Sequence, residues 1–109
     1  MMQVEMDVAK FFDDISRLIG FYNYYMHDGD GIAEGTLSDL KTSEEKIRYF
    51  QDDIKIYKRV KAFRLCCASR DSYWITFFKD QHYLSLIINA IRLFERACKT
   101  KGLECLLSA

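Results

Sequence analysis

The absence of chain-breaking residues over a long stretch most constrains this fold. The 109-residue chain contains no proline, and the 66 residues between Gly35 and Gly102 contain no glycine either. Domains built from β-strands need frequent turns, and glycine and proline supply many of them. So long a stretch without either residue therefore favours long helices. Because 50% of the residues are hydrophobic, we expect one folded domain over residues 1–109.

An amphipathic helix is predicted over about residues 4–27. Hydrophobic residues recur there at spacings of three and four: Val4, Val8, Phe11, Phe12, Ile15, Leu18, Ile19 and Tyr22. That spacing places them on one side of a helix. Asp13, Asp14 and Arg17 fall outside this stripe, on the side predicted to face solvent. Gly20 lowers the helix propensity, and we interpret it as the sign of a close helix crossing.

The sequence DGDGIAEG, residues 28–35, is predicted to be a loop because it contains three glycines. A second helix should begin near Thr36 or Thr42. Both threonines are followed three positions later by an acid, Asp39 or Glu45, as at helix N-termini, and the second pair is a complete capping box.

The continuation of this second helix is ambiguous. Hydrophobic residues mark one side as far as Tyr57, and at about 100° per residue Val60 and Phe63 then fall nearly opposite Ile54. A continuing helix would therefore be hydrophobic on two sides. The alternative is a β-hairpin at about residues 59–79, since the aromatic run YWITFF is typical of strands. The intervening SRDS lacks the Asn-Gly or Asp-Gly of a tight hairpin, which argues against this alternative.

A last helix is predicted with a hydrophobic stripe formed by Leu84, Ile87, Ile88, Ile91, Phe94 and Cys98. Asp80 is its expected N-cap, and Gly102 its expected end. Residues 103–107 are then either a docked tail or a short strand. Together these segments predict a mainly α fold, a single helix-rich domain with three long helices. The alternative is an α+β fold with the hairpin at 59–79 between helices.

The net charge of zero conceals two oppositely charged halves. Residues 1–54 hold twelve acids and five bases, whereas residues 55–109 hold eleven bases and four acids. The halves either neutralise each other within the chain or present opposite potentials to a partner. Because one small monomer can hardly bury a helix with two hydrophobic sides, the sequence predicts a homodimer. Antiparallel chains would bring each acidic half against the other's basic half.

The N-terminal sequence MMQVEMDVAK carries Glu5 and Asp7 where a secretory leader would be basic and then apolar. No segment is apolar over the length that a membrane span needs. We therefore expect a cytoplasmic protein without membrane contact. The cysteine spacing suits neither a disulfide framework nor a zinc site, and no metal or cofactor is expected. Reduced structural thiols are expected at Cys66, Cys67, Cys98 and Cys105.

No catalytic motif stands out in the sequence. It contains no G-x-S-x-G, H-E-x-x-H or phosphate-binding loop, and neither His27 nor His82 stands in a triad pattern. We therefore expect no enzymatic activity. The sequence is interpreted as a small non-catalytic protein-binding protein, of inhibitor, immunity or adaptor type, that occludes a partner.

The predicted partner-binding surface combines tyrosines with the acids that follow them: Tyr22, Tyr24, Tyr25, Asp28, Asp30 and Glu34. Tyr24 and Tyr25 lie about 100° apart on a helix, so one core cannot easily bury both. Tyrosine is common at interface centres, and the acids suit a basic partner surface. The same acids could instead bind a cation weakly, or their segment could simply connect two helices without a binding role.

The alternative function is a small nucleic-acid-binding regulator that uses the basic segments 55–64 and 92–101. The bases of the first segment are Lys55, Lys58, Arg59, Lys61 and Arg64. Tyr57 and Phe63 lie between them, and such rings can stack on bases while the cations neutralise phosphates. A sequence isoelectric point of about 6.7 is low for a protein of this kind.

Overall fold

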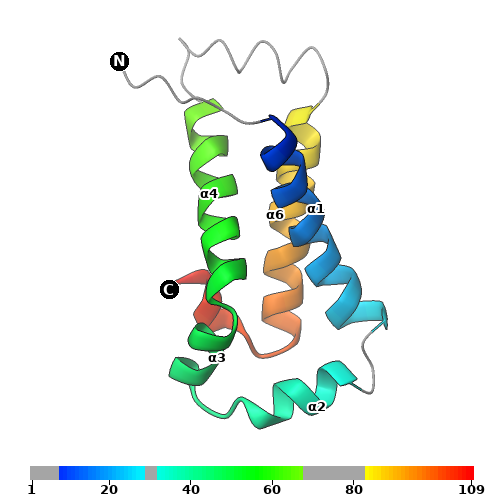
Figure 1. Cartoon of the computed structure of the whole chain (residues 1–109), viewed down its shortest axis with the longest axis vertical. Helices are drawn as coiled ribbons and strands as arrows, with labels where there is room; N and C mark the ends of the chain where they lie inside the picture. Colours follow the sequence, from blue (N-terminus) through cyan, green and yellow to red (C-terminus); the bar gives the residue numbers. More distant parts are fainter. Residues whose placement is uncertain (1–7, 29–31, 68–82) are drawn as a thin grey trace.

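The computed structural model describes residues 8–28, 32–67 and 83–109, which are mainly helical. Three long helices form the body of the molecule: α1 (Val8–Asn23), α4 (Gln51–Cys67) and α6 (Tyr83–Thr100). They pack against one another along the long axis (Figure 1). The predicted mainly α fold with three long helices is confirmed. None of the described helices is long and apolar enough to cross a membrane.

The alternative of a β-hairpin is wrong over the part of it that the structure describes. α4 continues as a regular helix to Cys67, through residues 59–67 of the predicted hairpin. Residues 68–79 lie outside the described part of the chain. The described residues contain no strand, so the fold that they form is α and not α+β.

The buried side of α4 is one broad arc and not two separate faces. Its buried hydrophobic residues are Ile54, Ile56, Tyr57, Val60 and Phe63. At about 100° per residue they cover roughly half of the helix circumference. Two helices cover this arc, because the Phe63 ring lies 5.1 Å from Phe11 of α1 and the Tyr57 ring 4.8 Å from Phe94 of α6.

One chain therefore buries both hydrophobic stripes of α4. The argument that a second chain is needed to cover the second stripe is wrong. The prediction of a homodimer then depends on the division of charge alone.

The predicted stripe of the first helix faces the core, with Phe11, Ile15, Leu18 and Phe21 buried. Two details of the prediction are wrong. Asp14 is buried and not on the solvent-facing side. Gly20 does not mark a close crossing, because a Cβ atom built there would have no neighbour within 4 Å.

Residues 29–31 of the predicted loop, 28–35, lie outside the described part of the chain, and the loop prediction is wrong for the rest of that segment. Helix α2 (Ile32–Asp39) begins inside it, so Gly35 is a helical residue. Thr36 does not cap a helix either, since its hydroxyl donates to the Ile32 carbonyl at 3.0 Å within α2. The loop was predicted because the segment contains three glycines. A short exposed helix can nevertheless contain a glycine, which lowers its helix propensity only modestly.

Helix α3 (Ser43–Tyr49) begins at the predicted capping box. The Thr42 hydroxyl accepts a hydrogen bond from the Glu45 backbone N–H at 3.1 Å, and it lies 3.1 Å from the Glu45 carboxylate. Buried Phe50 separates α3 from α4, and its N–H donates to the Lys46 carbonyl at 3.0 Å. The chain thus passes from α3 into α4 without an intervening loop.

Helix α6 ends at the predicted glycine. Gly102 has a φ of 70°, and the Leu103 N–H donates to the Cys98 carbonyl at 2.8 Å, the long hydrogen bond of a Schellman motif. A short 3-10 helix, η2 (Glu104–Leu107), follows, and Leu103 and Leu106 are buried. The C-terminal segment is therefore a docked tail, and the short strand considered for it is wrong.

Candidate functional site

Aromatic rings gather where the end of α1 meets the junction of α3 and α4. A π-helical turn, η1 (Tyr24–Asp28), extends α1. The Tyr25 ring lies 4.6 Å from that of Phe21 and 5.7 Å from that of Phe50, so Tyr25 packs on the core. The Tyr24 ring contacts Tyr25 edge-on at 4.9 Å, and Tyr24 remains 41% exposed. The two tyrosines thus differ in burial, as their angular separation predicts.

Tyr49 belongs to the same cluster, although the sequence did not single it out. Its ring lies 4.8 Å from that of Phe50, and it is 56% exposed. The pKa of Tyr25 is raised to about 12, mainly by burial and to a smaller extent by the neighbouring Tyr49, Asp53 and Tyr24. These four residues, Tyr24, Tyr25, Tyr49 and Asp53, are called the tyrosine patch below.

Asp53 supplies the carboxylate of the tyrosine patch. It is half-buried, and burial raises its pKa, while Arg17 lowers it and Asp52 raises it. A partly desolvated carboxylate beside tyrosine hydroxyls is a strong hydrogen-bond acceptor for cationic or N–H donors. The patch can therefore offer a partner both ring surface and a polar acceptor.

The structure places only part of the predicted surface in this patch. Tyr24 and Tyr25 belong to it. Tyr22 is half-buried, and its ring packs against His27 at 5.4 Å. The Tyr22 ring thus packs against a neighbouring side chain of the same segment and does not belong to the tyrosine patch.

The acids predicted for this surface are placed less completely. Glu34 is exposed on α2. Asp30 and the side chain of Asp28 lie outside the described residues. Within the described part of the chain, no three His, Cys, Asp or Glu side chains lie close enough together to hold a metal ion. The acidic contribution to the surface remains a prediction.

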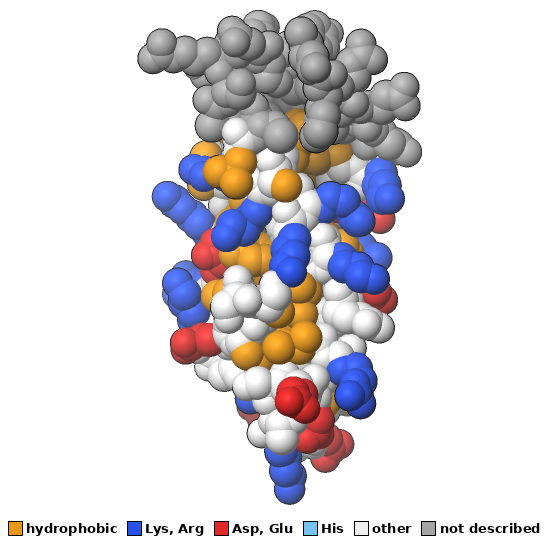
Figure 2. All heavy atoms as spheres, turned by 90° about the vertical axis from the view of Figure 1, so that its left-hand side faces the viewer, with side chains coloured by type: hydrophobic (Ala, Val, Ile, Leu, Met, Phe, Trp, Pro, Cys, Tyr) orange, Lys and Arg blue, Asp and Glu red, His pale blue; other side chains and the backbone are white. Residues whose placement is uncertain are grey.

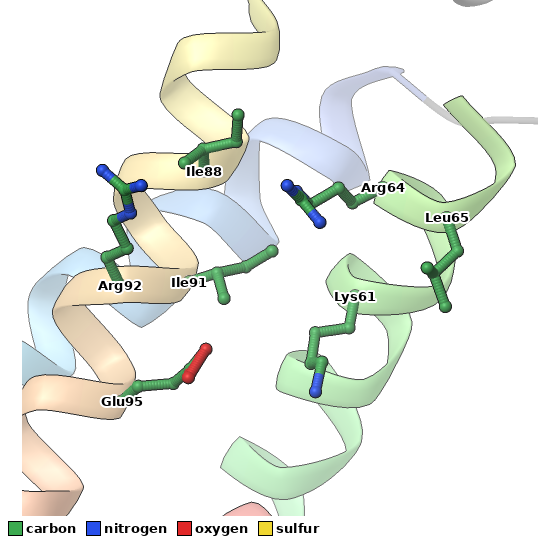
Figure 3. Close-up of a pocket in the computed structure, with 7 residues that line it drawn as sticks. All are labelled: Lys61, Arg64, Leu65, Ile88, Ile91, Arg92 and Glu95. Carbon is green, nitrogen blue, oxygen red and sulfur yellow. The ribbon is translucent and has the colours of Figure 1, made fainter. Parts of the chain in front are cut away.

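The two basic segments, 55–64 and 92–101, lie on neighbouring helices. A hollow with a volume of about 230 Å³ lies between α4 and α6 (Figure 3). It is lined by Lys61, Arg64, Leu65, Ile88, Ile91, Arg92 and Glu95. We call it the α4–α6 groove. Figure 2 shows Lys and Arg side chains across the middle and upper part of the face on which α4 lies, with Asp and Glu at its edges and, together with further Lys and Arg, in its lower part.

Not every predicted base belongs to this groove. Lys55 and Lys58 are exposed on α4 but do not line it. The Arg59 guanidinium is bonded to the carboxylate of Asp14 on α1 through two hydrogen bonds, at 2.8 and 2.9 Å. Arg59 is therefore committed to a contact between helices.

The rings between the predicted bases are not available for stacking. Tyr57 and Phe63 are both buried in the core. The Lys61 ammonium lies 5.1 Å from the centroid of the Tyr57 ring. Burial raises the pKa of Tyr57, and a hydrogen bond between its side chain and Glu95 adds to the effect. The expectation that these two rings stack on bases is wrong.

The cysteines that the structure describes are free thiols. Cys98 is fully buried, and burial raises its pKa to about 12, whereas Cys105 is half-buried. A thiol with so high a pKa is a poor nucleophile and a poor metal ligand. The side chains of Cys66 and Cys67 lie outside the described residues.

Comparison with known proteins assigns no family to the chain. No family model, no curated protein and no solved structure matches it. The candidate surfaces therefore rest on the geometry of the described residues.

Proposed function

We propose that this chain is a small non-catalytic protein-binding protein, of inhibitor, immunity or adaptor type, which acts by covering a surface of a partner protein. The tyrosine patch is the observation that supports this proposal. Tyr24 and Tyr49 lie on different helices and both expose their rings near half-buried Tyr25. Exposed tyrosines with a polar tip supply much of the binding energy in many interfaces.

The patch is backed by the core. Phe21 and Phe50 are buried beneath it, and Tyr25 contacts both rings. Side chains held in this way lose less conformational entropy on binding than free ones. Asp53 and exposed Glu34 favour a partner whose contacting surface is basic.

Affinity capture tests this proposal. Immobilised wild-type protein is incubated with a lysate of its native host, beside a Tyr24→Ala/Tyr49→Ala variant, and bound proteins are quantified by mass spectrometry. We expect a partner that is enriched on the wild type and lost from the variant. Leu65→Ser, which alters the α4–α6 groove, is the matched control and should retain it. The tyrosine patch is removed from the proposal if every protein that is enriched on the wild type is captured equally by the double variant.

A nucleic-acid-binding regulator is the second candidate. This candidate is supported by three bases that line one groove, Lys61 and Arg64 of α4 and Arg92 of α6. A gel shift on generic DNA and RNA separates the two candidates, because binding through phosphates weakens steeply as salt rises. No shift at low salt would remove this candidate.

Homodimerisation and a cytoplasmic location remain further predictions. The support for a dimer is the division of acids and bases between the two halves of the chain. Light scattering checks it, and a mass of 12.9 kDa in moderate salt would exclude a stable dimer. Fractionation of host cells that express the tagged chain checks the location.

A further inference from the structure

The α4–α6 groove has hydrophobic walls and a charged rim. Ile91 is buried at its base, and Ile88 is half-buried. Leu65 is 67% exposed, the highest value among the large hydrophobic residues that line the groove. In Figure 3 Arg64 and Glu95 extend from opposite helices into the space between them, with α1 behind. The exposed leucine beside a groove is apolar surface that a partner could cover.

The cations of the groove have no acidic partner among the described residues. Lys61, Arg64 and Arg92 are exposed, and none makes an ion pair within 4 Å with a residue of the described part of the chain. Glu95 is the acidic lining residue, and it is hydrogen-bonded to the Tyr57 side chain. Three cations against one carboxylate leave the groove positive.

The size and shape of the groove fit a segment of protein. Its volume of about 230 Å³ lies below the roughly 300–1,000 Å³ of small-molecule sites. The lining residues of α6 follow the pattern i, i+3, i+4 and i+7, from Ile88 to Glu95. That is two helical turns, or roughly 10 Å. Two helices with such a seam between them accept the hydrophobic side of a third, as in helix-in-groove recognition.

We propose that the α4–α6 groove binds an acidic amphipathic helix of a partner protein. Hydrophobic side chains of that helix would cover Leu65 and Ile88, and its carboxylates would pair with Lys61, Arg64 and Arg92. The groove residues Lys61, Arg64 and Leu65 lie in the C-terminal half of α4, whereas Tyr49 and Asp53 of the tyrosine patch lie just before and within its first turn. This second surface is therefore independent of the function proposed above.

Two observations favour a peptide over a nucleic acid in this groove: the rings closest to its cations in sequence are buried, and hydrophobic side chains line it. The aromatic residues nearest to the cations in sequence, Tyr57 and Phe63, are buried and cannot stack on bases. Leu65 and Ile88 instead offer the hydrophobic surface that a peptide side chain would cover.

Selection from a peptide library tests the proposal. A random peptide library displayed on phage is selected on immobilised full-length protein, and enriched peptides are synthesised and titrated by fluorescence anisotropy. We expect enriched sequences in which Asp or Glu flank hydrophobic residues spaced three and four apart. Arg64→Glu should weaken their binding by about tenfold, Leu65→Ser by a similar factor, and added salt should weaken it further.

Matched variants keep the test decisive. Lys55→Glu makes the same charge change on α4 outside the groove, and Tyr24→Ala alters the tyrosine patch; both should leave peptide affinity within about twofold. Circular dichroism confirms that each variant is folded. The proposal is overturned if no acidic sequence is enriched, or if Lys55→Glu weakens binding as much as Arg64→Glu. It is also overturned if single- or double-stranded oligonucleotides bind more tightly than the peptides and lose affinity in Arg64→Glu.

Discussion

Asp14 and Arg59 form a bidentate ion pair that joins α1 to α4. The Arg59 Nε lies 2.8 Å from Asp14 Oδ2, and its Nη2 lies 2.9 Å from Oδ1. The Asp14 side chain is 8% exposed and that of Arg59 is 48% exposed. The carboxylate has thus lost most of its hydration, and the two parallel N–H bonds replace it.

Replacing Arg59 with alanine should lower the free energy of unfolding by about 2 kcal/mol, because Asp14 would stay buried without its donor. Because about half of the Arg59 side chain contacts solvent, we expect a smaller loss of stability than for breaking a fully buried ion pair. Urea denaturation measures it. Lys58→Ala, at the preceding exposed position, is the control and should change stability by less than about 0.5 kcal/mol. Equal losses for the two variants would contradict a structural role for the pair.

Gly102→Ala should lower the free energy of unfolding by about 1 kcal/mol. The residue has a φ of 70°, which carries a steric cost for any side chain with a Cβ atom. Gly35→Ala is the matched control, since Gly35 lies inside α2 and a Cβ atom there meets nothing within 4 Å. That variant should be stabilised by about 0.5–1 kcal/mol. Thermal or urea denaturation measures the stability change of both variants. The prediction is contradicted if both variants change stability in the same direction.

Truncation of an exposed ring of the tyrosine patch should weaken partner binding strongly while leaving the fold intact. Tyr24→Ala or Tyr49→Ala should each cost about 2 kcal/mol of binding free energy. Glu34→Gln should cost nearer to 0.5 kcal/mol, mainly through the association rate. Surface plasmon resonance with the captured partner measures both rates. The prediction is contradicted if Glu34→Gln loses more binding free energy than either tyrosine variant. In that case charge, and not ring contact, would dominate binding at this surface.

Asp53→Asn should raise the stability of the protein at neutral pH. Burial raises the pKa of Asp53, so ionisation of this carboxyl opposes folding. The penalty is present above its folded pKa and disappears once the pH falls below the ordinary aspartate value of about 4. Urea denaturation at neutral pH and at about pH 3 should show a gain for Asp53→Asn only at the higher pH. Asp52→Asn, which changes an exposed neighbour, should gain less.

The described cysteines should differ in reactivity. Cys98 is fully buried with a pKa raised to about 12, whereas Cys105 is half-buried. Iodoacetamide should therefore modify Cys105 in the folded protein and reach Cys98 only after unfolding. Peptide mass mapping distinguishes the sites, and urea should abolish the difference. In reduced, unfolded protein a thiol titration should count all four cysteines of the sequence. Rapid modification of Cys98 in the native state would contradict its burial.

Local chemistry made several parts of the fold predictable. The stretch without glycine or proline indicated long helices, and hydrophobic spacing identified the core side of α1 and α6. The Thr42 capping box and Gly102 each depend on a few neighbouring residues, so they could be found where the helices begin and end. The angular separation of Tyr24 and Tyr25 likewise follows from helix geometry alone.

The arrangement of helices in space decided what the sequence left open. Periodicity showed two hydrophobic sides on α4 but could not show that α1 and α6 together cover a single broad arc. That ambiguity kept the hairpin and the second chain as alternatives. The same limitation placed Asp14 on the solvent side, because its partner Arg59 is distant in sequence and the pairing requires α1 and α4 to be adjacent.

The candidate surfaces divide in the same way. The sequence by itself determined which residue types were present: tyrosines at the end of the first helix and bases in two segments. Tertiary structure placed Tyr49 and Asp53 beside these tyrosines. It brought Lys61 and Arg64 of α4 to the same groove as Arg92 of α6. It also placed Arg59, Tyr57 and Phe63 in contacts within the chain. The physical reason is that periodicity within a helix fixes only the direction in which each side chain points, whereas burial and pairing depend on which other helix lies in that direction.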